Sequence, residues 1–194
     1  MIKHNLKIYA YAILGLAFVT YALIFIIHQD LSSIDFRLAV KDVSYAISIN
    51  FIIWLVFIKW CWKWKIFHGW LVPFPDLSGK WNGYLKSNWN NKKLEPIPTE
   101  IEIKQSFFHL SIRLKTGESE SFSNSATFDI DVDRGISQLF YSYTNYPRPS
   151  VRDRSQIHYG TTLLKITDYP VVKMAGEYWT SRESTGEIEI EKEQ

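Results

Sequence analysis

The segment near the C-terminus carries the most specific chemistry in this sequence. In an extended chain, Tyr178, Thr180 and Arg182 would lie on one face, because successive side chains of a strand point to opposite sides. An aromatic ring can stack on a nucleobase, and a guanidinium can bind a phosphate through two parallel hydrogen bonds. The three side chains therefore indicate a site for an anionic ligand with a flat ring, although a solvent-exposed strand face could carry the same residues.

A second group of candidate residues precedes this segment. The run LFYSYTNY at 139–146 leads into a loop with three arginines between positions 148 and 154. Arginines so close together concentrate positive potential, which suits a phosphate; a loop resting on anionic lipid is the alternative. The candidate ligand-binding residues are Tyr141, Tyr143, Asn145, Arg148, Arg152, His158, Thr161, Tyr178, Thr180 and Arg182.

Composition and motifs narrow the class of protein that could use such residues. The chain has 194 residues with 22 basic and 20 acidic side chains, a net charge of +2. A protein that coats DNA or RNA is normally far more basic, so no nucleic-acid polymer is expected as a partner. The sequence contains no phosphate-binding glycine loop, nucleophile elbow or zinc-protease motif, and its 5 histidines lack metal-ligand spacing. We therefore expect a binding protein that is not an enzyme and has no metal or other cofactor.

Two apolar runs near the N-terminus predict transmembrane helices. Residues 8–27 carry no charge, and 20 helical residues span roughly 30 Å, the thickness of the hydrocarbon core of a bilayer. Residues 43–58 form a shorter run, which the tryptophans and lysines of 59–65 extend into the membrane–water interface. The alternatives are a signal peptide for the first run and a buried helix of a soluble domain for the second.

The distribution of basic residues predicts the orientation of these helices. The outer flanks carry five lysines, whereas the connector at 30–42 carries Arg37 and Lys41. Because basic residues are enriched on the cytoplasmic side, both termini of this multi-pass protein should face the cytoplasm. The second span also holds Ser44, Ser48 and Asn50, which either contact helices of other copies or join the two spans of one hairpin.

The period of the apolar residues changes after Pro73 and Pro75. From there on apolar and polar residues alternate in many segments, which is typical of half-buried strands. We expect strands near 80–88, 99–107, 108–115, 124–132, 137–145, 157–167, 173–183 and 186–192. Short connections favour an antiparallel meander that closes into a compact barrel of about eight strands, with a β-sandwich as the alternative. The expected domains are a two-helix transmembrane hairpin with an interfacial segment at 1–75 and a cytoplasmic, ligand-sensing all-β domain at 76–194.

The start of the β domain adds one motif. Gly79-Lys80-Trp81 opens the first expected strand and resembles the motif that begins lipocalin-like barrels, in which the tryptophan closes one end of the barrel. We expect Trp81 to have this structural role and not to contact a ligand.

The whole chain resembles a known family. Two N-terminal spans followed by a minimal β-barrel, opened here by LSGKWNGYL and closed by MAGEYWTSRESTGEIEIE, are similar to the two-transmembrane β-barrel effectors of CBASS antiphage systems. These effectors are encoded beside a cyclic-nucleotide synthase, a CD-NTase. The resemblance implies a bacterial inner-membrane protein whose barrel binds a cyclic dinucleotide. It also implies that the ligand drives oligomerisation of the spans, disruption of the membrane lipids and abortive infection.

A second hypothesis remains open at this point, a membrane-tethered lipocalin-like barrel that binds a lipid or another apolar ligand. The lining of the barrel separates the two. Arginine, tyrosine, threonine and asparagine favour the nucleotide, whereas an unbroken apolar lining favours the lipid. The mixed face of Tyr178, Thr180 and Arg182 favours the nucleotide.

Overall fold

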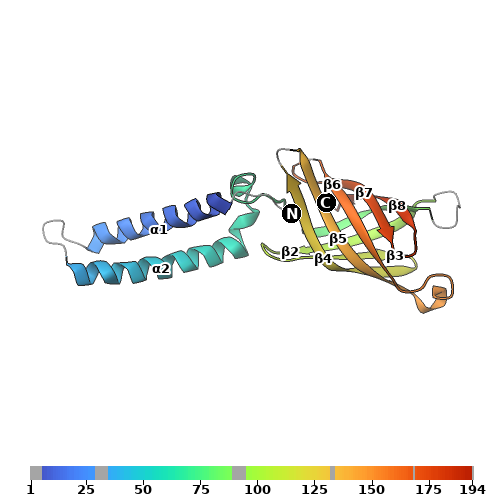
Figure 1. Ribbon diagram of the computed structural model, residues 1–194, viewed down its shortest axis with the longest axis horizontal. Coiled ribbons are helices and arrows are strands. Elements are labelled where there is room, and N and C mark those ends of the chain that lie inside the picture. Colours follow the sequence, from blue (N-terminus) through green and yellow to red (C-terminus); the bar gives the residue numbers. More distant parts are fainter. Residues whose placement is uncertain (1–5, 29–34, 89–94, 132–133, 168, 194) are drawn as a thin grey trace. The chain divides into compact units, whose positions relative to one another are not determined.

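The protein consists of a helical hairpin and an eight-stranded β-barrel (Figure 1). The computed structural model describes residues 6–28, 35–88, 95–131, 134–167 and 169–193. The chain forms two compact units with a boundary between Pro73 and Phe74, and each unit is described by itself below.

The helical unit contains α1 (Leu6–His28) and α2 (Phe36–Lys59), both long and apolar enough to cross a membrane. Helix α2 begins earlier than its charge-free run, so the expectation that the connector extends to Asp42 is wrong. Asp35 caps the helix, its carboxylate accepting a hydrogen bond from the backbone N–H of Arg37 at 2.8 Å. The charge of Asp42 does not end the helix, because its carboxylate is 2.7 Å from Nδ1 of His28 and only 1% exposed.

Polar groups also join the two helices near their centres. Asn50 donates hydrogen bonds to Oγ1 of Thr20 at 2.5 Å and to the carbonyl of Ala46 at 2.8 Å. In contrast, Ser44 and Ser48 lie on the exposed side of α2, where the Ser48 hydroxyl donates to the Ser44 carbonyl. Asn50 therefore has the second of the two roles expected for these groups, because it joins the two spans of one hairpin. The two serines remain available for contacts with other helices.

Two short 3-10 helices follow α2, at Cys61–Lys63 and Lys65–Phe67. Trp62 is buried, whereas the indoles of Trp60, Trp64 and Trp70 are each at least half exposed. The ammonium of Lys59 lies 4.5 Å from the ring centroid of Trp60. Exposed indoles beside lysines are typical of a segment at the membrane–water interface.

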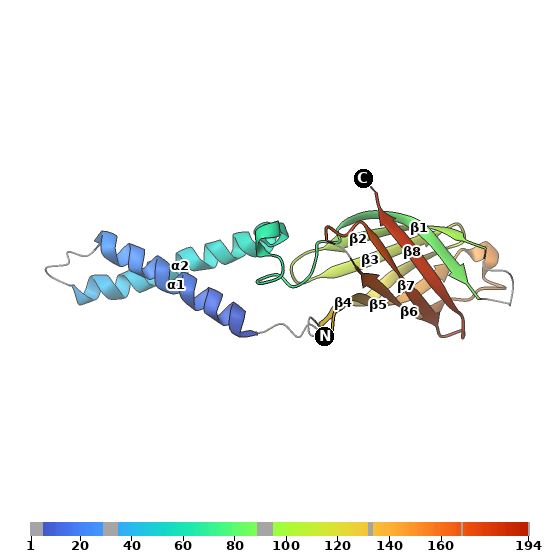
Figure 2. The same ribbon diagram turned by 90° about the horizontal axis from the view of Figure 1, so that it is seen from above.

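The β unit is a closed antiparallel barrel, as the sequence predicted (Figure 2). Each strand pairs with the next, and β1 pairs with β8, from Trp81 opposite Lys192 to Ser87 opposite Gly186. Because the sheet closes on itself, none of the eight described strands is an edge strand, although β3 and β4 pair only from Arg113 opposite Phe122 to Lys115 opposite Glu120. The strands are β1 (Gly79–Ser87), β2 (Ile97–Gln105), β3 (Leu110–Thr116), β4 (Ser119–Asp131), β5 (Ile136–Pro147), β6 (His158–Ile166), β7 (Lys173–Thr180) and β8 (Thr185–Lys192).

The bounds agree with the expected strands to within two residues except at β4 and at the end of β7. The strand expected at 173–183 ends at Thr180, so Arg182 lies in the turn that follows and not on the strand. Strand β4 was expected to begin at 124 and begins at Ser119, because the polar run at 118–125 pairs with β5 and does not form a loop. A bulge between Ser123 and Ser125 interrupts the period of two in this run. The last residue of the expected strand 124–132 lies outside the described residues.

Apolar side chains fill the end of the barrel where the chain enters. Trp81 is 0% exposed, and its indole N–H donates to the Leu77 carbonyl at 2.9 Å, which confirms its expected structural role. The ring of Phe74 stacks on Phe128 with 5.4 Å between the centroids. This end is therefore closed. The buried apolar side chains of the strands include Ile101, Ile103, Ile112, Phe128, Leu139, Leu164, Met174, Ile188 and Ile190.

Candidate functional site

The other end of the barrel opens into a cavity of about 910 Å³. Its rim is formed by the connections β3–β4, β5–β6 and β7–β8, together with Ser87, Glu95 and Pro96 beside β1 and β2. These lie opposite the closed end because adjacent strands are antiparallel. A pocket of this size falls within the range of about 300–1,000 Å³ that is usual for small-molecule sites. Its inner wall carries tyrosines, hydroxyl groups, an amide, an imidazole and a guanidinium.

Three tyrosines form the aromatic part of the wall. Tyr141 and Tyr143 come from β5, with ring centroids 6.0 Å apart, and Tyr178 comes from β7. Burial raises the pKa of Tyr141 to about 12 and also raises those of Tyr143 and Tyr178. All three phenols therefore stay protonated at neutral pH, so they can donate hydrogen bonds and offer ring faces for stacking.

Arg182 brings a positive charge to these rings. It follows β7 in the turn to β8, and its Nη1 donates to the Ser155 hydroxyl at 3.0 Å. Burial lowers the pKa of its guanidinium, while Tyr143 and Tyr178 act in the opposite direction. An arginine nevertheless keeps its charge, so the pocket presents a partly desolvated cation beside aromatic rings. Such a cation attracts an anion more strongly than an arginine in bulk solvent does.

His158 occupies the pocket wall at the start of β6. Its Nδ1 is 2.8 Å from the carbonyl of Gln156, and since a carbonyl can only accept, Nδ1 carries a proton. Burial lowers the pKa of His158, and the charge of Arg182 lowers it further. The imidazole is therefore neutral at neutral pH, with Nε2 as an acceptor.

Hydrogen bonds orient the smaller polar groups of the wall. The Ser121 hydroxyl on β4 donates to Oδ1 of Asn145 at 2.8 Å, so the amide nitrogen of Asn145 is directed away from this contact. The hydroxyls of Thr180 and Ser184 are 2.7 Å apart. The first of these bonds links β4 to β5, and the second links β7 to the turn that leads into β8.

The structure brings seven of the ten predicted site residues into this pocket. They are Tyr141, Tyr143, Asn145, His158, Tyr178, Thr180 and Arg182.

The remaining three lie elsewhere. Thr161 pairs with Trp179 on the outer face of the barrel, and the neighbouring Thr162 lines the pocket instead. Arg152 turns back to its own loop, its Nε donating to the Pro147 carbonyl at 3.2 Å. Arg148 lines a different hollow, described below.

Other pocket residues were not among the predicted set. Thr162, Ser121, Ser184 and Arg154 all line the pocket. Arg154 belongs to the arginine-rich loop that the sequence singled out, so a signal for it existed. Ser121 belongs to the polar run at 118–125, whose single apolar residue, Phe122, is exposed while Ser121 faces the polar cavity.

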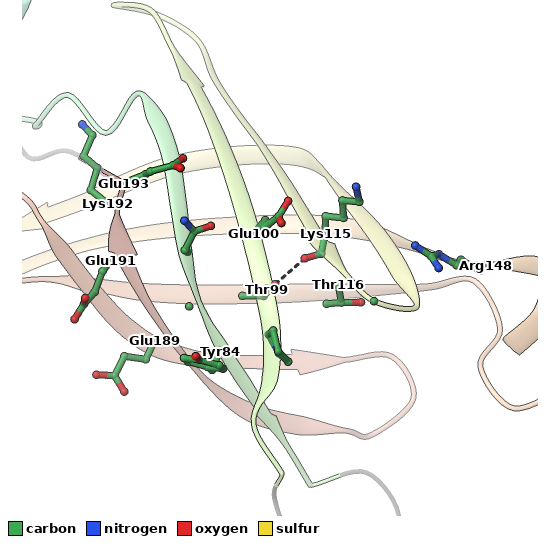
Figure 3. Close-up of a pocket in the computed structure, with 14 residues that line it drawn as sticks. Tyr84, Thr99, Glu100, Lys115, Thr116, Arg148, Glu189, Glu191, Lys192 and Glu193 are labelled. Atoms are coloured by element: carbon green, nitrogen blue, oxygen red, sulfur yellow. Dashed lines mark hydrogen bonds between the residues drawn. The ribbon is translucent and has the colours of Figure 1, made fainter.

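A second hollow, of about 870 Å³, lies on the outside of the barrel over β1, β2 and β8 (Figure 3). Figure 3 shows Glu189 and Glu191 on one side of it and Arg148 on the other. Glu100 and Glu193 add two further carboxylates to its lining. These four carboxylates outnumber the three cations of the lining, Lys115, Arg148 and Lys192, so the internal pocket is the better candidate site for a phosphate.

Neither cavity points to a metal. Within the described residues, no group of three or more histidine, cysteine, aspartate or glutamate side chains could hold a metal ion.

Comparisons with known proteins agree with this geometry. The family model described as "Cap15, cyclic dinucleotide receptor domain" matches residues 72–192, which include the whole barrel. A relative from Staphylococcus schleiferi named CD-NTase-associated protein 15 is 30% identical over 150 residues, covering 77% of this chain and 78% of the relative. A relative of the same name from Escherichia albertii is 28% identical over 160 residues, covering 79% of this chain and 81% of the relative. The chain therefore belongs to the Cap15 cyclic dinucleotide receptor family, which confirms the resemblance to CBASS effectors noted from its sequence.

Proposed function

We propose that this protein is a membrane-anchored receptor whose barrel binds one cyclic dinucleotide in the internal pocket. The observation that carries the proposal is that Arg182, Tyr143 and Tyr178 line one pocket, inside a barrel that a cyclic-dinucleotide receptor family matches. The rings would stack on a base, and the guanidinium would bind a phosphate. The role is that of a receptor without enzymatic activity or a resident cofactor.

The lining of the pocket favours this ligand over a lipid. The apolar half of the barrel is occupied by its own side chains, with Trp81, Leu139 and Ile190 all 0% exposed. The open half carries the tyrosines, the hydroxyl groups and Arg182. An acyl chain would gain little in such a pocket, because burying polar groups without hydrogen-bond partners is costly.

We further propose that the helical hairpin crosses the bacterial inner membrane, with both termini in the cytoplasm. Many apolar side chains of α1 and α2 are exposed in the hairpin, among them Leu14, Phe18, Ile47 and Phe51. Membrane lipids would cover them. Trp60, Trp64 and the adjacent lysines would lie at the headgroup level.

The output is proposed to be assembly of ligand-bound copies and disruption of the membrane, which ends the growth of an infected cell before phage mature. Ser44 and Ser48 lie on the exposed side of α2, where they can contact a helix of another copy. Each such contact contributes only about 0.6–2 kcal/mol in a membrane, so isolated copies stay dispersed. Bringing several barrels together raises the effective concentration of the helices, so that many weak contacts act at once.

Calorimetric titration of the full chain in detergent micelles tests the binding step. The ligands are cyclic di-AMP, cyclic di-GMP, cyclic GMP–AMP and cyclic UMP–AMP. We expect one of them to bind with a stoichiometry of one per barrel. Lack of binding by the folded protein to every member of the panel would refute the proposal.

The membrane step needs a separate experiment in cells. We expect ligand-dependent entry of a membrane-impermeant dye when the full chain is expressed, and none when residues 76–194 are expressed alone. The control replaces α1 and α2 with an unrelated transmembrane hairpin, which should keep ligand binding and abolish dye entry. If that variant permeabilises cells equally well, the native helices serve only as tethers.

A further inference from the structure

The pocket contains two guanidinium groups in different environments, and a cyclic dinucleotide contains two phosphates. The arginines are Arg182, in the β7–β8 turn, and Arg154, in the β5–β6 connection. Arg182 is partly buried, whereas the side chain of Arg154 is 66% exposed. The two phosphates of the ligand lie on opposite sides of its ring, so one cation cannot bind both.

The β5–β6 connection places these two groups on different sides of the pocket mouth. Ser155 accepts a hydrogen bond from Arg182, which fixes the connection to the β7–β8 turn. The residue before it, Arg154, extends to the β3–β4 turn and donates from Nη2 to Oε1 of Glu118 at 2.5 Å. The backbone N–H of Arg148 also donates to the Glu118 carbonyl, at 2.8 Å. The connection is thus attached on both sides of the mouth.

The partner of Arg154 is itself an anion. A carboxylate binds a guanidinium with the same planar, two-point geometry as a phosphate. Glu118 also lines the pocket, and its side chain is 61% exposed, so solvent can replace it on Arg154. An exposed pair of this kind contributes little stability, and its exchange for another anion is therefore inexpensive.

We propose that the two phosphates are bound unequally, one by Arg182 within the pocket and the other by Arg154 at the mouth, where it displaces Glu118. The inference rests on the proposed function and assigns roles to Arg154 and Glu118 that it does not include. Glu118 acts as an internal competitor that occupies Arg154 when no ligand is bound. The two nucleotide halves of the ligand would then contact different residues, since only the inner half reaches Tyr141 and Tyr178.

The test is calorimetric titration of the full chain in detergent micelles with the cyclic dinucleotide that the wild-type protein binds best. We expect Glu118→Gln to tighten binding about two- to fivefold, because Arg154 is released from its carboxylate. Arg154→Ala should weaken binding by about the same factor, and Arg182→Ala should weaken it at least about tenfold. Thermal melting of each variant checks that the barrel stays folded.

Glu120→Gln is the matched control. It removes one carboxylate two residues away, but Glu120 pairs with Arg113 at 2.7 Å and does not line the pocket. Equal tightening by Glu118→Gln and Glu120→Gln would mean that only the overall charge matters, and it would overturn the inference. So would unchanged binding by Glu118→Gln or by Arg154→Ala. If the wild-type protein binds no cyclic dinucleotide, the proposed function fails and this inference with it.

Discussion

Gly160 offers a way to disturb the pocket without removing any polar group. It lies on β6 directly opposite Tyr143 on β5. A Cβ atom at position 160 would lie 2.4 Å from both Cζ and the hydroxyl oxygen of the Tyr143 ring, and such atoms essentially never approach within 3.0 Å. The Gly160→Ala substitution must therefore push the ring of Tyr143 to another position.

The contacts set the size of two effects. Overpacking a well-filled site usually costs about 1–3 kcal/mol of folding stability. If Tyr143 stacks on a base of the ligand, its displacement removes a contact worth about 1–3 kcal/mol, which corresponds to a roughly 5- to 150-fold loss of affinity. In the double variant Gly160→Ala/Tyr143→Ala the ring is absent, so the added methyl group has nothing to displace. This double variant should be as stable as Tyr143→Ala alone.

Thermal melting and calorimetric titration with a cyclic dinucleotide measure these effects on the full chain. Gly117→Ala is the control, because Gly117 also lines the pocket but a Cβ there would meet nothing within 4 Å. The control should melt and bind like the wild-type protein. If Gly160→Ala folds normally and binds with unchanged affinity, the ring of Tyr143 is not part of the binding wall and the reasoning fails.

Three further variants test other parts of the wall. Arg182→Ala should remove a charge-assisted phosphate contact of roughly 1.5–3 kcal/mol, a loss of about ten- to hundredfold in affinity by calorimetry, without a comparable loss in melting temperature. Thr162→Val should weaken binding, whereas Thr161→Val should not, because only Thr162 lines the pocket; equal effects would contradict the assigned facing of β6. The pKa of His158 lies below its ordinary value of 6.5, so between these two values the unfolded chain binds more protons. Stability of the ligand-free protein should therefore fall as pH drops below about 6.5, and His158→Gln should make melting curves between pH 5 and 8 less dependent on pH; an unchanged pH dependence would show that His158 does not titrate as inferred.

The barrel could be predicted because one face of most strands packs against a core. Strict alternation in β2 and β8 gives each side chain a definite face, as with Ile101 and Ile188, both almost fully buried. The same logic placed Tyr178 and Thr180 together correctly, since both lie on β7. Arg182 also lines the pocket, but it does so from the turn after β7 and not from the expected strand face. Trp81 was assigned through its motif, and its burial agrees with that assignment.

The period disappears where the barrel faces its polar cavity. In β4 the inward position Ser121 is polar and the outward Phe122 is apolar, so the sequence there does not show the pattern of a strand that packs on an apolar core. In β6 the pairs Thr161-Thr162 and Leu163-Leu164 place identical residues on both faces of the sheet. The sequence therefore does not show which residue of each pair faces the inside of the barrel. The register with β5 and β7 decides the facing, and only the folded sheet supplies it.

The directions of the side chains in the β5–β6 connection could not be assigned from the sequence. Arg148, Arg152 and Arg154 belong to one connection, yet they contact three different surroundings. A loop has no regular period from which the direction of a side chain could be predicted, so the spacing of the three arginines does not show where each side chain points. Asp42 was assigned to the connector for a related reason: the charge-free run begins after it, and its partner His28 lies 14 residues away.

The position of the pocket bears on how a ligand could act on the helices. The chain enters the barrel at the end closed by Trp81, and the pocket opens at the other end, among the connections between strands. Between the two ends lies a closed sheet around tightly packed side chains such as Leu139 and Ile190. Deforming such a core is costly, because packed interiors resist even small displacements. A ligand at the mouth changes the surface of the connections much more readily than it changes the closed end. This arrangement favours a mechanism in which ligand-bound barrels bring copies of the protein together over one in which each barrel pulls on its own helices.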